Sequence, residues 1–284
     1  MDVYSTVTNS IVAELEKGAA PWIKPWRADG SADRNLVSGK SYNGINRLLL
    51  GMSAMAHGYT RPEWATYKQF TEAGAQVNKG EKATHIVFFK PIGGGKNAET
   101  GETEAGYCVI RSYAVFNATQ TNLPASDTLT VPVDFNPIPA CEQFIYGTGA
   151  NISHGGDAAF FMPSQDRIQL PNKSAFDVPA SYYATAFHEL THWTGAKTRL
   201  DRNLSAGRFG NPAYAFEELV AEIGAAFLCA DMGIQGELRH AGYIGHWLKA
   251  CREDSKAIFK AAALSQKAAD YLKACQTNQE RIAA

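Results

Sequence analysis

The chain has 284 residues, of which 45% are hydrophobic and 19% charged, and its formal net charge is −1. This composition is typical of a soluble globular protein, and the length is sufficient for two domains of ordinary size. No segment approaches the roughly 18 consecutive apolar residues of a membrane-spanning helix. Lys and Arg outnumber Asp and Glu by twelve to eight in residues 1–98. This small positive balance is compatible with a polyanionic partner for the first part of the chain.

The sequence carries no pattern of an exported protein. Its first residues combine acidic and apolar side chains and have neither a basic start nor a continuous apolar run. The five cysteines are far apart and form no CxxC pair, so we expect reduced thiols. We therefore expect a cytoplasmic monomer that has no membrane segment.

The first part of the chain is predicted to contain both helices and strands. Apolar residues recur at helical spacing from Tyr4 to Leu15, and Gly18 could end this helix. β-Branched and aromatic residues predict two strands, joined by a polar glycine-rich loop into a long hairpin. The expected helices are 4–15, 43–57 and 64–73, and the expected strands are 84–90 and 106–116.

The second part is predicted to be mainly helical with a small sheet. Asp177-Val-Pro is a start signal for a helix that Gly195 would end. Asn211-Pro212 starts the next helix in the same way, and Gly233 would end it. The remaining expectations are a helix at 141–146, strands at 158–162 and 167–170, and helical structure over 241–282. The predicted fold class is α+β, with two domains at 1–130 and 140–284.

The helix that follows Asp177 contains His188-Glu-Leu-Thr-His192, an HExxH sequence. Residues four apart lie on one face of a helix, so both imidazoles can bind one ion, with Glu189 beside it. Zinc accepts imidazole nitrogen and carboxylate oxygen and lowers the pKa of a bound water to about 7. Glu189 is placed to accept the proton of that water.

The next helix supplies a third ligand. It places Glu218 and Glu222 four residues apart on one face of a helix that is apolar nearly all round. Buried carboxylates need partners, and a cation is the simplest one. We assign Glu218 to the metal and Glu222 to a supporting position, as an acceptor for a ligand histidine. Glu217 points about 100° away, although an error of one residue is open. Zinc is the preferred ion, and Mn or Co could use the same ligands.

Two residues at the start of the last helical stretch have alternative roles. His240 and Tyr243 could stabilise the oxyanion that forms during peptide hydrolysis, or they could simply cap and pack at a helix start.

Several blocks of the sequence resemble a known family. HELTHWTGAKTRLDR and YAFEELVAEIGAAFLCA resemble the zincin-like domain of ArdC-type antirestriction proteins. PWIKPW, SYNGINRLLL, VNKGEKATHIVFFKP and VFNATQ resemble the N-terminal single-stranded-DNA-binding domain of the same proteins, which TraC-type plasmid primases share. The resemblance implies a plasmid-encoded protein that binds single-stranded DNA and protects incoming conjugative DNA from restriction. It also implies a gluzincin-like zinc metallopeptidase site.

The first domain contains the residue types that single-strand binding requires, namely aromatic faces for stacking and cations for phosphates. Asparagines could bond to sugar or base. The candidate DNA contacts are Trp22, Lys24, Trp26, Arg27, Tyr42, Asn43, Asn46, Arg47, Lys79, Lys82 and Asn117. Each of them could instead pack in the fold or face water.

Three functions remain open from the sequence. The first is the antirestriction protein, with a possible protein substrate in the host defence machinery. The second is a cytoplasmic zinc-dependent peptidase whose N-terminal domain recognises a protein substrate. The third is a purely structural ion between two helices. The complete set of His188, Glu189, His192 and Glu218 disfavours it, because a structural site would not need Glu189 and is usually closed by a fourth side chain.

Overall fold

The structure is a computed structural model. It describes residues 2–16, 33–92, 95–96, 103–104, 107–124, 138–156, 158–176, 179–202, 204, 212–234 and 244–283. No helix in these ranges is both long enough and apolar enough to cross a membrane.

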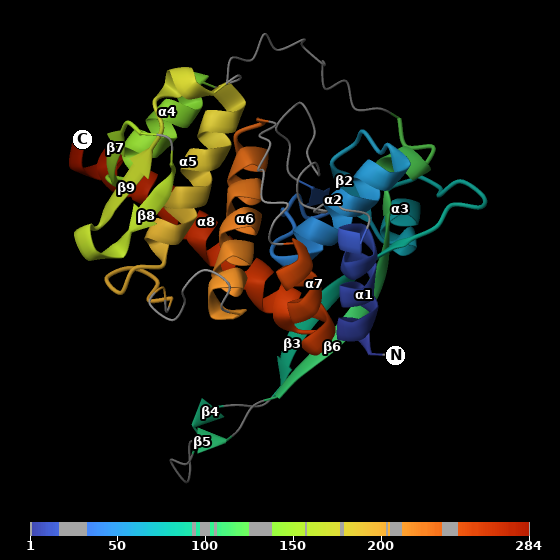
Figure 1. The fold of residues 1–284 in the computed structure, drawn as a ribbon. Coiled ribbons are helices and arrows are strands. Elements are labelled where there is room, and N and C mark those ends of the chain that lie inside the picture. The colour runs from blue at the N-terminus through green and yellow to red at the C-terminus, as the bar shows by residue number, and fades with distance from the viewer. Residues whose placement is uncertain are drawn as a thin grey trace.

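The first part of the chain is a four-stranded sheet with helices beside it (Figure 1). The sheet order is β1-β2-β6-β3, and β3 and β6 form a long antiparallel hairpin that projects from the molecule. The strands are β1 (Arg34–Asn35), β2 (Glu63–Ala65), β3 (Thr84–Ile92) and β6 (Tyr107–Asn117), with β4 (Gly95–Lys96) and β5 (Thr103–Glu104) paired near the hairpin tip. The helices are α1 (Val3–Glu16), α2 (Ile45–His57), α3 (Tyr67–Glu72) and the short 3-10 turn η1 (Ala118–Gln120).

The second part is a group of helices with a three-stranded sheet on its outer side (Figure 1). In this sheet β9 lies between β7, which is parallel to it, and β8, which is antiparallel. The strands are β7 (Asn151–His154), β8 (Phe160–Met162) and β9 (Arg167–Leu170), accompanied by the 3-10 turns η2 (Pro163–Gln165) and η3 (Lys173–Ala175). The helices are α4 (Ile138–Gly147), α5 (Pro179–Thr194), α6 (Pro212–Asp231), α7 (Ile244–Glu253) and α8 (Ala257–Ala283). The predicted α+β fold class is confirmed.

The structure differs from the sequence-based elements at two places in particular. Trp64 belongs to a strand instead of starting a helix, because Thr66 caps α3 two residues later through a capping box with Gln69. The last helical stretch is divided into α7 and α8 at Asp254, whose carboxylate accepts from the backbone N–H of Lys256. The strand β7 was not predicted.

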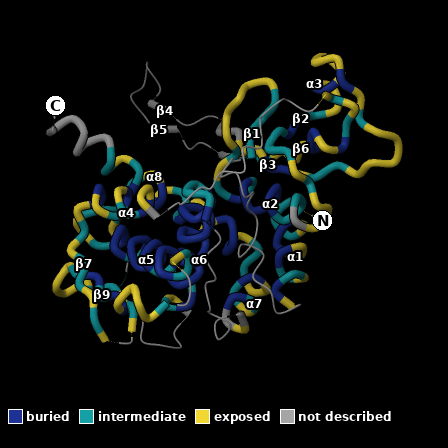
Figure 2. The backbone as a smooth tube through the Cα atoms, turned by 90° about the horizontal axis from the view of Figure 1, so that it is seen from above, coloured by how far each residue is buried: buried dark blue, intermediate teal, exposed yellow. Residues whose placement is uncertain are grey.

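The two parts share one hydrophobic core. Buried residues of α1, α2 and β3 belong to the same cluster as those of α4 to α8. Figure 2 shows that the residues of α5 and α6 are buried almost throughout. Helices α1 and α2 lie against the same interior. Polar contacts cross the same boundary, since Arg47 of α2 donates to the backbone oxygen of Phe227 and pairs with Asp231 at the end of α6. The domain limits 1–130 and 140–284 stay a prediction.

Helices α5 and α6 approach each other closely at Gly224. A Cβ atom at this position would lie 2.6 Å from Cγ2 and 2.7 Å from Oγ1 of Thr191, which is fully buried. The absence of a side chain at Gly224 therefore lets α6 approach the helix that carries the HExxH sequence.

We expect Gly224→Ala to lower the free energy of unfolding by about 1–3 kcal/mol, because a methyl group would overpack this contact. The matched control is Gly245→Ala in α7, where an added Cβ would meet nothing within 4 Å. Alanine is the better helix former, so the control should keep or slightly raise the melting temperature. Thermal unfolding of both variants checks this. Equal melting temperatures for Gly224→Ala and the wild type would contradict the close-contact argument.

Candidate metal centre

Helix α5 presents both histidines of the HExxH sequence at one point. His188 and His192 lie one turn apart, and their Nε2 atoms are 3.2 Å from each other. The two rings are nearly perpendicular, with centroids 4.8 Å apart. His188 is buried and the side chain of His192 is 13% exposed, so the pair faces the protein interior with limited access to solvent.

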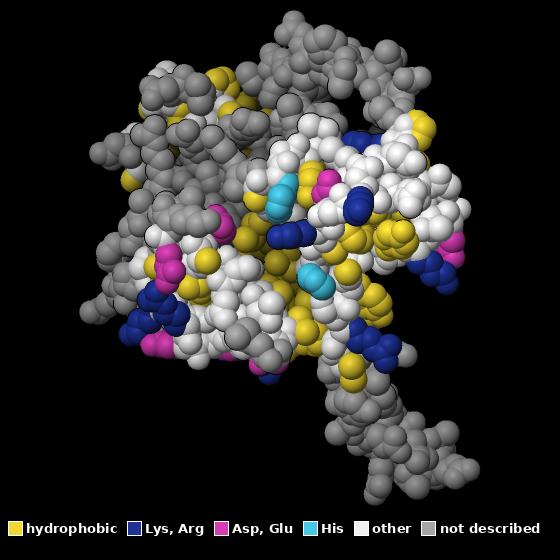
Figure 3. Space-filling view, turned by 90° about the vertical axis from the view of Figure 1, so that its right-hand side faces the viewer, with side chains coloured by type: hydrophobic (Ala, Val, Ile, Leu, Met, Phe, Trp, Pro, Cys, Tyr) yellow, Lys and Arg dark blue, Asp and Glu magenta, His cyan; other side chains and the backbone are white. Residues whose placement is uncertain are grey.

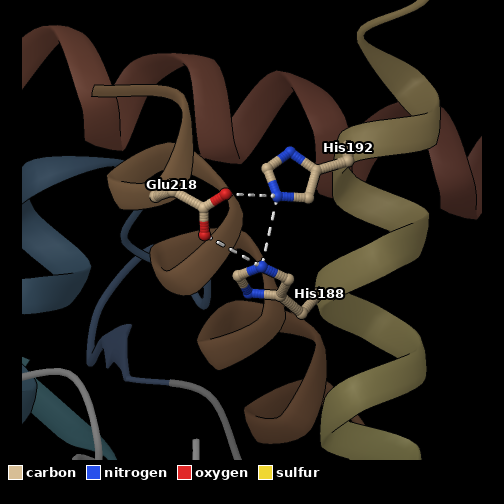
Figure 4. Close-up of side chains that lie close together, drawn as sticks. All are labelled: His188, His192 and Glu218. Atoms are coloured by element: carbon tan, nitrogen blue, oxygen red, sulfur yellow. Dashed lines mark hydrogen bonds and ion pairs between the residues drawn. The ribbon is translucent and has the colours of Figure 1, made fainter. Parts of the chain in front are cut away.

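Helix α6 brings Glu218 to the same point (Figure 4). Its two carboxylate oxygens lie 3.5 Å from Nε2 of His188 and 3.5 Å from Nε2 of His192. Ligand atoms from all three residues therefore lie within 4.8 Å of one another. Glu218 itself is only 6% exposed.

This arrangement fits a divalent metal ion. Two ligands bound to a tetrahedral zinc at about 2.0–2.1 Å lie roughly 3.3 Å apart. The separation of 3.2 Å between the imidazole nitrogens matches that spacing, and the two 3.5 Å distances to the carboxylate are close to it. Two imidazoles and one carboxylate also form the donor set of catalytic zinc sites, in which a fourth position is left for water or substrate.

The charges around the three residues favour a cation between them. Burial opposes a charge on His192, but contacts with Glu217 and Glu218 outweigh it and raise the pKa of His192 to about 10. Burial likewise opposes ionisation of Glu218, but its contacts with His188 and His192 hold the pKa of Glu218 far below the usual range. For His188, burial is the largest effect and lowers its pKa. The site therefore stabilises the carboxylate in its charged form, as a metal ligand requires.

Glu217 holds the other nitrogen of His192. Its Oε1 atom lies 3.2 Å from Nδ1 of His192, and the same carboxylate accepts from Nε and Nη2 of Arg202. Burial alone would raise the pKa of Glu217, but these contacts with His192 and Arg202 lower it. A carboxylate in this position fixes the ring orientation of a ligand histidine.

Arg202 in turn is anchored to the end of α5. It donates to the Thr191 carbonyl oxygen at 2.6 Å and to the Thr194 hydroxyl oxygen at 2.8 Å. A side chain at Gly195 would obstruct it, because a Cβ there would lie 2.9 Å from the Nη2 atom of Arg202. Arg202 therefore connects the segment after α5 to Glu217 on α6.

The roles of Glu217 and Arg202 were not predicted from the sequence. Glu217 was not assigned to the metal because its side chain points about 100° away from Glu218 on the helix. That same direction brings Glu217 to the far side of His192. The adjacent pair of glutamates was the available signal, whereas no local pattern indicated the position of Arg202.

Two other residues predicted for this site, Glu189 and Glu222, are buried. Glu189 is 5% exposed, and its charge contributes to the raised pKa of His192. Glu222 is 1% exposed and lies one turn after Glu218. The catalytic role of Glu189 and the supporting role of Glu222 stay predictions. His240 and Tyr243 lie outside the described residues.

Two of the predicted DNA contacts are held inside the fold. Arg47 is 8% exposed, its guanidinium carbon lies 4.8 Å from the centre of the Phe227 ring, and it is paired with Asp231. Asn117 is fully buried, where it caps η1 and donates to the carbonyl oxygen of Arg61. Both side chains serve the fold because their polar groups are held inside it.

Among the remaining predicted DNA contacts, some side chains form hydrogen bonds within the fold and others are exposed. The side chain of Asn46 pairs with both the N–H and the carbonyl oxygen of Val87, and so completes the edge of β3. Tyr42 is half-buried, and its hydroxyl accepts a hydrogen bond from Asn35. Asn43, Lys79 and Lys82 are exposed. The other four, Trp22, Lys24, Trp26 and Arg27, lie outside the described residues.

Family comparisons match both parts of the chain. Residues 1–116 match the model of the N-terminal domain of anti-restriction factor ArdC. Residues 139–264 match a zincin-like metallopeptidase model.

Similar proteins cover nearly the whole chain. The protein y4eC of Sinorhizobium fredii (strain NBRC 101917 / NGR234) is 40% identical over 290 residues, which are 99% of this chain and 94% of that protein. A DNA primase TraC of Escherichia coli is 39% identical over 97% of this chain, but the matched part is only 27% of the primase.

Solved structures of antirestriction protein ArdC from plasmid R388 have the same fold. The metal-free structure matches with a TM-score of 0.81 at 38% identity, and the Mn(II)-bound structure with 0.78 at 37%. Each alignment covers 98% of this chain and 99% of the ArdC chain. Because this similarity extends over both parts and includes the helices that carry His188, His192 and Glu218, the chain belongs to the ArdC family of antirestriction proteins.

Proposed function

We propose that this protein binds single-stranded DNA with its N-terminal part and carries a metal-dependent peptidase centre in its C-terminal part. Together these activities would protect incoming conjugative DNA from host restriction. The observation that carries the proposal is the joint presence of an ArdC N-terminal domain and the cluster of His188, His192 and Glu218 in one chain. A protein of the host defence machinery is the substrate class that fits a peptidase in this setting.

Three residues would hold the ion, and the chain provides the groups around it. When bound, a divalent metal supplies Lewis-acid chemistry, which polarises a carbonyl group and makes water more acidic. His188, His192 and Glu218 would be its ligands, and zinc or Mn fits this donor set. Glu217 and Arg202 keep the ring of His192 in the ligating orientation.

Glu189 is the residue that we assign to proton transfer. Its carboxylate would accept a proton from the attacking water and return it to the leaving amine. This role fits its position between the two histidines in sequence and its buried location next to them. Burial also limits the access of bulk water, which strengthens electrostatic effects in the site.

The first part of the chain carries exposed groups suited to single-stranded DNA. Phe88 and Tyr113 lie on neighbouring strands, are 55% and 41% exposed, and have ring centroids 6.3 Å apart. Arg111 lies directly opposite Phe88 in the hairpin and is exposed. Hydrophobic and basic side chains lie next to each other on the stem of the hairpin (Figure 3). Aromatic faces and cations of this kind bind single strands without sequence preference.

Glu189→Gln should retain the metal and abolish peptide hydrolysis, because the amide keeps the shape of the side chain but cannot act as a base. Metal content by mass spectrometry and cleavage of a mixed peptide library check this prediction. Undiminished cleavage by the metal-loaded variant would rule out Glu189 as the base.

Glu218→Ala should weaken metal binding about 100-fold or more, because the loss of a direct ligand costs at least as much as the loss of a supporting carboxylate. Glu217→Ala should weaken it by about 10- to 100-fold. Glu253→Ala is the matched control, since its side chain is 66% exposed on α7. Titration with zinc and Mn against a competing chelator gives the affinities. Stoichiometric metal in Glu218→Ala but not in Glu217→Ala would reverse the two assignments.

The purified protein should bind single-stranded DNA more tightly than duplex DNA and lose affinity as salt rises, with a slope of about −0.7 for each phosphate that is neutralised. Fluorescence anisotropy across a salt series, with duplex competitor, measures both properties. Absence of binding at low salt would contradict the DNA part of the proposal. A peptidase whose N-terminal part recognises a protein substrate would then be the better description.

A further inference from the structure

A groove of about 620 Å³ opens on the first part of the molecule, away from the metal centre. It lies between the start of α3 and the segment that leads into β3. Its lining combines two aromatic rings, Tyr67 and Phe116, with the polar segment 76–81 and Asn122. An aromatic surface next to amides and a cation is a combination that can receive a nucleotide.

The polar wall of the groove is held in place by backbone pairing. The N–H of Gln76 donates to the side-chain oxygen of Asn122 at 2.6 Å, and the N–H of Asn122 donates to the carbonyl oxygen of Gln76 at 3.1 Å. The N–H of Asn78 donates to the carbonyl oxygen of Gln120 at 2.9 Å. The segment therefore forms a short antiparallel pair with the residues after β6.

A buried glutamine fixes the far end of this wall. Gln120 is 1% exposed, and its amide nitrogen donates to the Glu81 carboxylate at 2.8 Å and to the Lys82 carbonyl oxygen at 2.9 Å. Its side-chain oxygen accepts from the N–H of Asn117 at 2.8 Å. The groove is thus preformed, which reduces the entropic cost of binding.

Tyr67 offers an aromatic face at the mouth of the groove. It is the first residue of α3, which the capping box of Thr66 and Gln69 fixes, and it is 53% exposed. Its ring meets Phe116 edge to face at 6.5 Å between centroids, and the exposed half of the residue is accessible to another planar group.

Apart from Glu81, whose carboxylate accepts from the Gln120 amide, the polar groups around this ring match the parts of one nucleotide. The side chains of Gln76 and Asn78 are exposed, and each amide offers both donors and an acceptor for the edge of a base. Lys79 is exposed beside them and can neutralise a phosphate. A base in duplex DNA is already stacked and paired, so that a site which takes one base between a ring and amides selects single strands.

We propose that this groove binds one nucleotide of single-stranded DNA. The base stacks on Tyr67, its edge meets the amides of Gln76 and Asn78, and the flanking phosphate pairs with Lys79. The inference rests on the proposed single-strand binding and assigns it a specific site. Tyr67 was not among the DNA contacts predicted from the sequence.

The test compares binding of a fluorescent oligothymidylate by the full-length protein and three tyrosine variants. Tyr67→Ala should weaken binding at least about fivefold, because stacking of a base on an aromatic ring contributes about 1–3 kcal/mol. Tyr67→Phe should bind like the wild type, since it retains the ring. Tyr146→Ala is the matched control. This tyrosine is 82% exposed on α4, and its removal should leave the affinity for the oligothymidylate unchanged.

A second measurement addresses Lys79 and the position of the base. Lys79→Gln should reduce the salt slope by about 0.7, while Lys249→Gln, which alters a lysine 70% exposed on α7, should leave it unchanged. Irradiation of an oligonucleotide that contains iododeoxyuridine should crosslink it to Tyr67, as identified by peptide mass spectrometry.

The outcomes separate this inference from the proposed function. If the wild type binds single strands but Tyr67→Ala and Lys79→Gln bind equally well and no crosslink forms at Tyr67, the groove is not the site although the protein is a single-strand binder. If the wild type does not bind single strands at all, the groove assignment and the DNA part of the proposed function are both wrong, whereas the proposed metal centre is unaffected. The groove assignment would also be overturned if a peptide were crosslinked to Tyr67 and single-stranded DNA did not compete with that peptide.

Discussion

The contact between α5 and α6 is the constraint on which the metal centre depends. Four of the residues buried at this contact, His188, Glu189, Glu218 and Glu222, are ionisable, and burying such groups is costly unless they pair. The close approach at Gly224 and Thr191 brings the two helices near enough for imidazole and carboxylate to meet. The packing of a small residue against a buried threonine therefore determines the geometry of the chemical site.

Support for the site comes from outside the two helices. Arg202 lies beyond the end of α5 and holds Glu217 with a bidentate contact, while its other donors satisfy backbone and hydroxyl oxygens at that helix end. An arginine suits this position because its planar group binds a carboxylate through two parallel hydrogen bonds and stays charged when buried. The orientation of His192 thus depends on a residue that is not a neighbour of the HExxH sequence.

The sequence was most informative where local spacing determines the structure. The interval of four between His188 and His192 and the prolines at the starts of α5 and α6 predicted these helices and the histidine pair. It was less informative where tertiary contacts determine the secondary structure or the burial of a residue. Trp64 was assigned to a helix, but its ring nitrogen bonds to Asp33 and its side chain is fully buried in the sheet region. Arg47 resembled a surface cation, and only the shared core shows why it is buried.

The shared core has a consequence for the inheritance of this protein. A boundary that is crossed by buried side chains and by the Arg47 contact cannot be cut without exposing apolar surface on both sides and leaving the Arg47 guanidinium without its carboxylate partner. Exchange of either half for an unrelated domain would therefore be selected against, and both halves should be transferred as one genetic block. The match to the much longer TraC primase extends over 97% of this chain without separating its two parts.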